Sequence, residues 1–398
     1  MKKITKQAVC SVFVAIMAVS RTHADKTPGD VRDIIQVDAL EPNGVHNKIW
    51  QPFIAKWMNK HYLVSYGLQL RGKVDMGDVV CSITKDKGKT WSPPIMIFDH
   101  RVPNGTMHYA YNNSVLFRES GQDIIWCFAM RSPAHFHDSE DANLCAAYSG
   151  DGGSSWIPVE LAMDYHGPLI TCGGIVPVND KSGTRYLLGV HRNTLRHDPA
   201  GDQQQFVLES RSLLRWKLAN YIPLNPEQPA WIHEGNIAPG EAPGELRIVT
   251  RTGAYKRGEK RPGVAYTAVS RDFGRTWSMA KPDPDLPNFQ SKGFFGKDSL
   301  GQYIYVYNDT PAREALYYKI KKPGNAWSEA RLFFGGQTRN SYPTLIEEKS
   351  GEWLCVWDSS NDPKTKRSVI RFGRLKVDQK MVLKAGCRPP PRTLRQDG

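Results

Sequence analysis

The chain has 398 residues and carries 53 Lys and Arg against 40 Asp and Glu, so its formal net charge at pH 7 is +13. Such an excess would attract nucleic acid or anionic glycans, but the basic residues are scattered and match no nucleic-acid-binding motif, which argues against nucleic acid. No stretch approaches the roughly 18 uninterrupted apolar residues of a membrane span. We therefore expect no membrane span, and an acidic saccharide as the partner.

The first 24 residues have the composition of a secretory signal peptide. Three lysines within residues 1–6 precede an apolar run, Ala8–Val19, that is too short to span a bilayer. Residues 22–24 (THA) then offer small side chains where a signal peptidase cleaves. We expect residues 1–24 to be removed and the mature protein to be secreted or periplasmic. Residues 386–398, rich in Pro, Arg and polar residues, are expected to form a disordered C-terminal tail.

An eight-residue pattern, S/T-x-D-x-G-x-x-W, recurs along the chain. Residues 84–91, 149–156 and 270–277 match it fully, and residues 209–216 and 320–327 are decayed copies that keep the tryptophan. The five tryptophans are about 60 residues apart. A repeat of this length, filled with short β-rich runs between turn residues, predicts a repeated antiparallel sheet.

Each copy of the pattern, called an Asp box, has a mechanical explanation. The aspartate accepts hydrogen bonds from the turn that follows it, the glycine takes a positive φ, and the tryptophan buries a large surface. Asp86, Asp151 and Asp272 are therefore interpreted as turn-formers and not as catalysts. Five boxes, with unmarked sequence at both ends, favour an all-β, six-bladed β-propeller as one catalytic domain over residues 25–385, because a closed ring hides the sheet edges.

The segments between the boxes carry the candidate site residues. Asp75 opens a D-x-G-x-V motif that leads through a short apolar run into the first box. Glu234 (in WIHEGNI) and Arg251 (in LRIVTR) lie on two runs ahead of the third complete box. Arg313 follows an NDTP turn, and Tyr342 lies in NSYPTL, ahead of GEWLCVWD.

In this order and among Asp boxes, these segments resemble the sialidase (neuraminidase) superfamily over nearly all of the mature chain. The resemblance implies that Asp75 is the general acid/base and that Tyr342 is the nucleophile, assisted by Glu234. It also implies that Arg251 and Arg313 bind the substrate carboxylate, because guanidinium groups form paired, charge-assisted bonds with carboxylates. A neutral tyrosine suits this chemistry, since a carboxylate nucleophile would be repelled by the carboxylate that a sialic acid carries at its anomeric carbon.

The sequence departs from the family pattern at the first triad arginine. KIWQP stands where the superfamily has R-I-P, and Trp50 occupies the arginine position. Asp358 stands where the family has the glutamate that braces this arginine. Lys48, His46 and Arg71 are the candidates to replace the missing charge.

The resemblance predicts an exo-α-sialidase-like retaining glycoside hydrolase that releases terminal sialic acid or a related acidic keto-sugar. We expect a monomer without metal or cofactor. Glu241 is the alternative to Glu234, because the spacing to Arg251 is one residue longer than usual. Two other functions stay open, a hydrolase or lyase acting on uronic-acid polysaccharide and a non-catalytic glycan-binding propeller. Candidate bases for the former are His108, Tyr109, His135, His137 and His233.

The seven cysteines show no C-x-x-C spacing. Cys10 lies in the expected signal peptide, and most of the others lie in apolar strand-like runs. We expect these to be small buried side chains and not disulfides or zinc ligands. They are Cys81, Cys127, Cys145, Cys172, Cys355 and Cys387.

Overall fold

The computed structural model describes residues 32–36, 44–58, 61–73, 75–104, 106–133, 142–192, 204–225, 230–253, 262–336, 339–360 and 368–377. The signal peptide at 1–24, the tail at 386–398, Cys387 and the candidate bases His135 and His137 lie outside these residues, so they stay predictions. Within these residues, no helix has the length and apolar character that crossing a membrane requires.

The described residues form strands β1 to β25, arranged in five sheets. One sheet has the order β1 (Arg32–Gln36), β25 (Val369–Lys376), β24 (Glu352–Ser360), β23 (Arg339–Lys349). A second runs β10 (Ala162–Met163), β14 (Arg215–Tyr221), β13 (Gln204–Ser210), β12 (Gly183–Arg192), β11 (Ile170–Asp180). A third runs β15 (Trp231–Pro239), β16 (Leu246–Gly253), β17 (Val264–Ser270), β18 (Lys281–Pro287), and a fourth β19 (Phe294–Lys297), β20 (Tyr303–Asn308), β21 (Ala315–Lys321), β22 (Arg331–Gly335).

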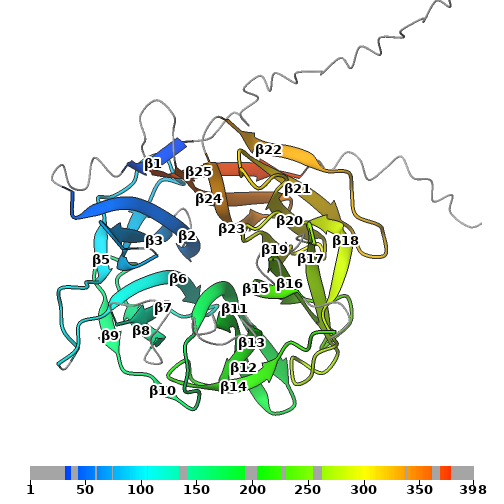
Figure 1. Cartoon of the computed structure of the whole chain (residues 1–398), viewed down its shortest axis with the longest axis horizontal. Helices are drawn as coiled ribbons and strands as arrows, with labels where there is room; N and C mark the ends of the chain where they lie inside the picture. The colour runs from blue at the N-terminus through cyan, green and yellow to red at the C-terminus, as the bar shows by residue number, and fades with distance from the viewer. Residues whose placement is uncertain are drawn as a thin grey trace, which may run out of the picture.

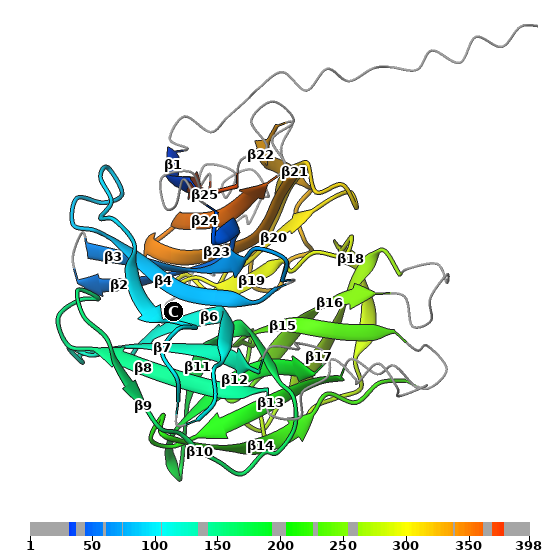
Figure 2. The same ribbon diagram turned by 60° about the vertical axis from the view of Figure 1, so that its left-hand side comes forward.

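The fifth sheet has eight strands. Its order is β2 (His46–Met58), β3 (His61–Leu70), β4 (Gly77–Thr84), β6 (Ala110–Arg118), β7 (Ile125–Ser132), β8 (Asn143–Ser149), β9 (Ile157–Val159), with β5 (Ile95–Phe98) paired to β4. Its two halves are joined only by the pairing of Gly77 in β4 with Tyr111 in β6, where the two strands lie side by side (Figure 2).

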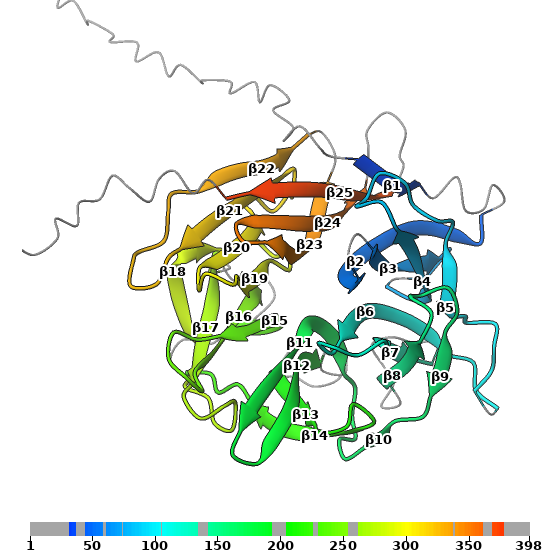
Figure 3. The same cartoon turned by 180° about the vertical axis from the view of Figure 1, so that it is seen from behind.

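The sheets surround a common centre, as Figures 1 and 3 show from opposite sides. The innermost strands β2, β6, β11, β15, β19 and β23 contact one another in this order, and β23 contacts β2 to complete the ring. The ring is also closed by hydrogen bonding, because the first strand β1 pairs antiparallel with β25. The expected all-β, propeller-like fold is confirmed. The count of six blades stays a prediction, since strand pairing gives five sheets.

The Asp boxes are the tight turns that the sequence predicted. Asp86 Oδ1 accepts hydrogen bonds of 2.9 Å from the backbone N–H groups of Lys89 and Thr90, and its Oδ2 accepts one of 2.6 Å from the Thr90 hydroxyl. The boxes of Asp151 and Asp272 repeat the bonds to the residue four places later. The turn-former interpretation is therefore confirmed for these three aspartates.

Apolar side chains fill the spaces between neighbouring sheets. Trp216 of a decayed box is fully buried, and its ring lies 5.5 Å from that of Phe128 in the adjacent sheet, in an edge-to-face arrangement. The cysteines of the described residues are buried and free, in agreement with the prediction that they pack as small apolar groups. They are Cys81, Cys127, Cys145, Cys172 and Cys355.

Four of the innermost strands bulge toward the centre of the ring. Gln51 in β2, Asn113 in β6, Glu234 in β15 and Tyr342 in β23 have φ between 49° and 54°, and each lies where the pairing register of its strand shifts. Non-glycine residues rarely adopt this left-handed conformation, and bulges of this kind re-aim side chains next to functional sites. The four side chains line one central pocket.

Candidate active site

Three predicted site residues meet at the centre of the ring. The Tyr342 hydroxyl donates a 3.1 Å hydrogen bond to Glu234 Oε1, although 108 residues separate the two in the chain. Arg251 Nη1 donates to Glu234 Oε2 at 2.8 Å and to the Tyr342 hydroxyl oxygen at 3.2 Å. The three side chains therefore form a closed hydrogen-bonded triangle in which a guanidinium contacts both the phenol and the carboxylate.

The electrostatics of this triangle favour an ionised glutamate beside a neutral tyrosine. Burial raises the pKa of Glu234, but the charge of Arg251 and the hydrogen bond from it outweigh burial and hold this pKa well below its usual range. Burial and the charge of Glu234 raise the pKa of Tyr342, against the opposing charges of Arg251 and Arg313. Glu234 is therefore an ionised hydrogen-bond acceptor for a phenol that stays protonated in the free protein.

Arg313 is the second arginine near Tyr342. Its Cζ is 5.6 Å from the ring centroid of Tyr342, a cation–π distance. Its Nη2 donates to the backbone carbonyl of Gln290, whereas its buried Nη1 has no hydrogen-bond partner within the described part of the chain. A buried guanidinium nitrogen without an acceptor is a donor available to an anionic ligand.

Asp75 lies in the turn between β3 and β4 and faces the same charges. The Asn112 side chain donates to its backbone carbonyl at 2.8 Å, and φ of Asp75 is 60°. Burial raises the pKa of the Asp75 carboxyl to about 6, while the charge of Lys48 lowers it and that of Glu234 raises it. Asp75 is therefore protonated in mildly acidic solution, as a general acid must be.

At the position of the missing arginine, the structure separates the three candidate replacements. Trp50 is buried, and the ammonium of Lys48 lies 4.6 Å from its ring centroid. Burial lowers the pKa of Lys48, and the charges of Asp358 and Asp75 raise it, so this ammonium lies within electrostatic reach of the site. His46 instead contacts Asp78 at 2.7 Å, and Arg71 is exposed and donates to the Gly44 carbonyl at 2.6 Å.

The carboxylate of Asp358 binds one backbone N–H and one side-chain hydroxyl next to the site. Its Oδ2 accepts a 3.0 Å hydrogen bond from the backbone N–H of Gln51, and its Oδ1 accepts one of 2.7 Å from the Ser341 hydroxyl. It thus connects β2 with β23, next to the bulges that carry Gln51 and Tyr342. In this chain the Asp358 carboxylate therefore holds β2 and β23 together beside these two bulges.

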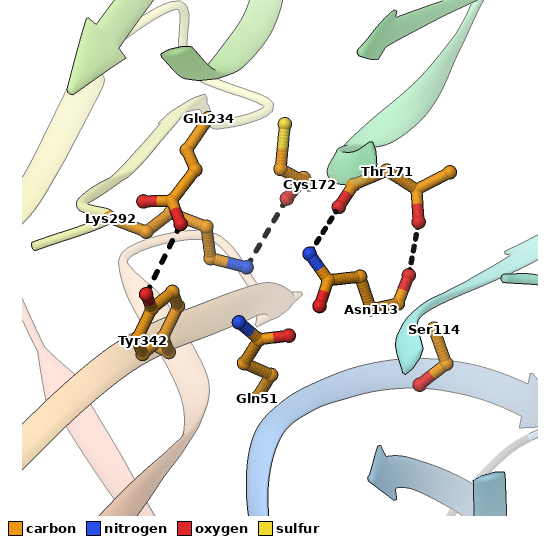
Figure 4. Close-up of a pocket in the computed structure, with 8 residues that line it drawn as sticks. All are labelled: Gln51, Asn113, Ser114, Thr171, Cys172, Glu234, Lys292 and Tyr342. Atoms are coloured by element: carbon orange, nitrogen blue, oxygen red, sulfur yellow. Dashed lines mark hydrogen bonds between the residues drawn. The ribbon is translucent and has the colours of Figure 1, made fainter. Parts of the chain in front are cut away.

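The pocket at the triangle is lined mainly by polar residues and has a cavity volume of about 10 Å³, which is room for about one water molecule (Figure 4). Its lining includes the buried Lys292, whose Nζ donates to the Cys172 carbonyl at 3.2 Å and lies 5.8 Å from the Tyr342 ring centroid. The lining residues are Gln51, Asn113, Ser114, Thr171, Cys172, Glu234, Lys292 and Tyr342. Neighbouring Gly173 is needed for close packing, because a Cβ there would lie 2.5 Å from the Gly235 carbonyl oxygen.

Sequence reasoning missed two cations of the site. Lys292 has no motif around it, and its position became visible only through the contacts above. Arg339, at the start of β23, is partly buried, and its charge lowers the pKa of Asp75, Lys48 and Arg313. Its place three residues before Tyr342 is the one signal in the sequence that could have identified it.

The other candidates lie in different places, and only His233 is a buried neighbour of Glu234 in the chain. Glu241, the alternative glutamate, is exposed and forms a 3.4 Å ion pair with Lys321. Among the alternative bases, His108 is exposed, whereas burial holds the pKa of His233 well below its usual range. Burial and the charge of Arg251 therefore keep His233 neutral.

Comparison with known proteins agrees with this architecture. A family model described as a BNR repeat-like domain matches residues 72–355. The chain belongs to this family. Members of the BNR repeat-like family and the sialidases form one superfamily, so the resemblance read from the sequence is confirmed at this level. Comparison with curated protein sequences gives no significant match.

Solved structures similar to this BNR repeat-like chain include a protein of unknown function and two sialidases. A Dyadobacter fermentans protein of unknown function aligns over 88% of this chain and all of its own, with a TM-score of 0.60 and 18% identity. The Hadza microbial sialidase Hz136 aligns over 84% of this chain and 66% of its own, with a TM-score of 0.64 and 17% identity. The NanB sialidase of Streptococcus pneumoniae aligns over 87% and 71%, with a TM-score of 0.64 and 13% identity. Similarity at these identities establishes the shared fold.

Proposed function

We propose that this protein is an exo-α-sialidase-like retaining glycoside hydrolase that releases terminal sialic acid or a related acidic keto-sugar from glycans. The observation that carries the proposal is the contact between the Tyr342 hydroxyl and Glu234, 3.1 Å apart, with Arg251 bonded to both. A nucleophile beside a base that a third group orients is the arrangement of nucleophilic catalysis.

The mechanism follows from the charges of the site. The Tyr342 oxygen attacks the anomeric carbon while Glu234 accepts its proton, and Asp75 protonates the departing glycosidic oxygen. The pKa of Asp75, about 6, suits this role. In the second step Asp75 accepts a proton from water, and the water oxygen bonds to the anomeric carbon. The tyrosyl–sugar bond breaks as Glu234 returns its proton to the Tyr342 oxygen. Two displacements give overall retention of configuration.

Substrate binding relies on the cations around Tyr342. Arg251 and the unpartnered Nη1 of Arg313 bind the sugar carboxylate. Lys48 supplies the positive charge that Trp50 cannot, and the charges of Asp358 and Asp75, which both raise the pKa of Lys48, support this role. An ammonium is a point charge without the planar fork of a guanidinium. We therefore expect this site to accept a wider range of acidic keto-sugars than an all-arginine clamp.

The proposal includes a six-bladed ring in an exported monomer. Dividing the eight-stranded sheet at its single Gly77–Tyr111 pair gives six units, each with an innermost strand. The basic and apolar pattern of residues 1–24 supports export to the periplasm or the medium.

A panel of aryl glycosides tests the proposal. We expect release of the aryl group from α-ketosides of sialic acid or keto-deoxy sugars, and nuclear magnetic resonance should detect the α-anomer as the first product. A new unsaturated-uronate absorbance on uronic-acid polysaccharide would instead identify a lyase. Binding of sialylated glycans without turnover would identify a non-catalytic propeller.

A further inference from the structure

A cluster of two histidines and an aspartate lies outside the triangle, and the mechanism above does not use it. His46 Nε2 is 2.7 Å from Asp78 Oδ2, and His100 Nδ1 is 2.7 Å from Asp78 Oδ1. The two imidazole rings are almost perpendicular, at 89°, with centroids 6.4 Å apart. The three donor atoms come from the start of β2, the start of β4 and the segment after β5, and they all lie within 4.8 Å of one another.

The burial of the cluster resembles that of a coordination site. His46 and Asp78 have exposed fractions of 6% and 1%, whereas 25% of the His100 side chain is exposed. The negative charge of Asp78 is thus buried between two groups that both bind metals, and the exposed edge of His100 gives an ion and its water ligands a way in. Two imidazole nitrogens and one carboxylate oxygen are a common ligand set for zinc, with the remaining position left to water.

The distances fit an ion-free form of such a site. Zinc binds nitrogen and oxygen ligands at about 2.0–2.2 Å, so two ligands of one ion can be up to about 4.2 Å apart. Donor atoms within 4.8 Å of one another therefore reach one ion after shifts of less than roughly 1 Å. In the ion-free form, each histidine donates an N–H to the carboxylate. On binding, the proton leaves this nitrogen for the other ring nitrogen or for solvent, and the freed lone pair faces the metal.

We propose that His46, Asp78 and His100 bind one divalent transition-metal ion of the zinc type. The ion joins β2, β4 and the segment after β5, and its site lies three residues from Asp75 along the chain. The role is structural and independent of the proposed hydrolysis. The sequence contains no sign of it, because 32 residues separate His46 from Asp78 and 22 separate Asp78 from His100.

Zinc titration of the full-length mature protein, first treated with chelator and dialysed, tests the site. Calorimetry should show one equivalent of Zn²⁺ bound per chain, with a saturable rise in Tm of at least about 2 °C. Co²⁺ should give visible absorption bands typical of a bound ion of low coordination number. His100→Gln should weaken Zn²⁺ binding more than roughly 100-fold, since loss of a ligand costs more than loss of an outer-sphere partner.

The controls separate this site from incidental binding by surface histidines. His166 is exposed, and His166→Gln should leave the zinc stoichiometry, affinity and Tm shift unchanged. If Asp78→Asn or His46→Gln lowers stability, His100→Gln still decides the matter, because this side chain is partly exposed. Zinc binding that is absent in the wild-type protein, or unchanged in His100→Gln, would overturn the proposal and leave a hydrogen-bonded His–Asp–His network.

Discussion

Replacing Tyr342 by phenylalanine separates catalysis from folding at the centre of the ring. The change deletes the hydrogen bond to Glu234 and the one from Arg251, while the 2.8 Å ion pair between these two residues remains. No charge is left without its partner, so the expected stability loss is about 2 kcal/mol. A folded domain with about 5–15 kcal/mol of stability survives this loss.

The effect on turnover should be much larger. Without a nucleophile, the enzyme loses covalent catalysis and keeps only substrate binding and acid assistance, so kcat should fall at least about 10⁴-fold, or about 5.4 kcal/mol. The assay is release of an aryl group from the best α-ketoside at saturating concentration. Mass spectrometry with a fluorinated substrate analogue should find an adduct on the wild-type peptide that contains Tyr342 and none on the variant.

Tyr66→Phe is the matched control. Tyr66 is fully buried and its hydroxyl bonds to the Ser82 hydroxyl at 3.1 Å, away from the triangle. This variant should lose a similar amount of stability and keep its turnover. A Tyr342→Phe enzyme whose kcat stays within about tenfold of the wild-type value would refute the nucleophile assignment.

Substitutions at three further residues test the remaining roles. Because Asp75 must be protonated to act as the acid, kcat/KM should fall above pH 6, and Asp75→Asn should remove this limb of the pH profile. The same variant should slow hydrolysis of substrates with poor leaving groups far more than hydrolysis of activated aryl glycosides. Because its pKa is raised in the folded state, the protonated Asp75 carboxyl contributes stability at low pH, and this stability is lost as the pH rises through 6. Asp75→Asn should therefore raise Tm relative to wild type at pH 8 and not at pH 4. Lys48→Met should raise KM for acidic keto-sugars about 10- to 100-fold, whereas Lys48→Arg should keep KM near the wild-type value. Equal KM values in the wild-type enzyme and both variants would exclude Lys48 from carboxylate binding. Asp86→Ala should lower Tm and leave kcat of the folded enzyme unchanged, and an equally large fall in kcat would contradict its purely mechanical role.

Much of this architecture could be predicted from the sequence, because the residues that form an Asp box are neighbours in the chain. Its hydrogen bonds span four residues, so the pattern around Asp86 contains everything the turn needs. Glu234 and Tyr342 could be named from flanking motifs, but their contact depends on the closure of the whole ring. The positive φ values that aim them inward leave no trace in residue type, since a glutamate and a tyrosine are unusual in this conformation. The place of Lys292 in the pocket could not be predicted for the same reason, because its burial depends on the assembly of all the sheets around the centre.

The pairing of β1 with β25 has a consequence for how the molecule is made. The first and last strands of the described chain share one sheet, so this pairing cannot close the ring until synthesis has passed residue 376. Until then the row of sheets is open, with the inner strands β2 and β23 at its two ends, and the central charges remain hydrated. The same closure brings the two ends of the described chain, strands β1 and β25, to one seam. A circular permutant, in which a linker joins these two strands and new termini are placed in an Asp-box turn, should therefore fold to the same ring of sheets.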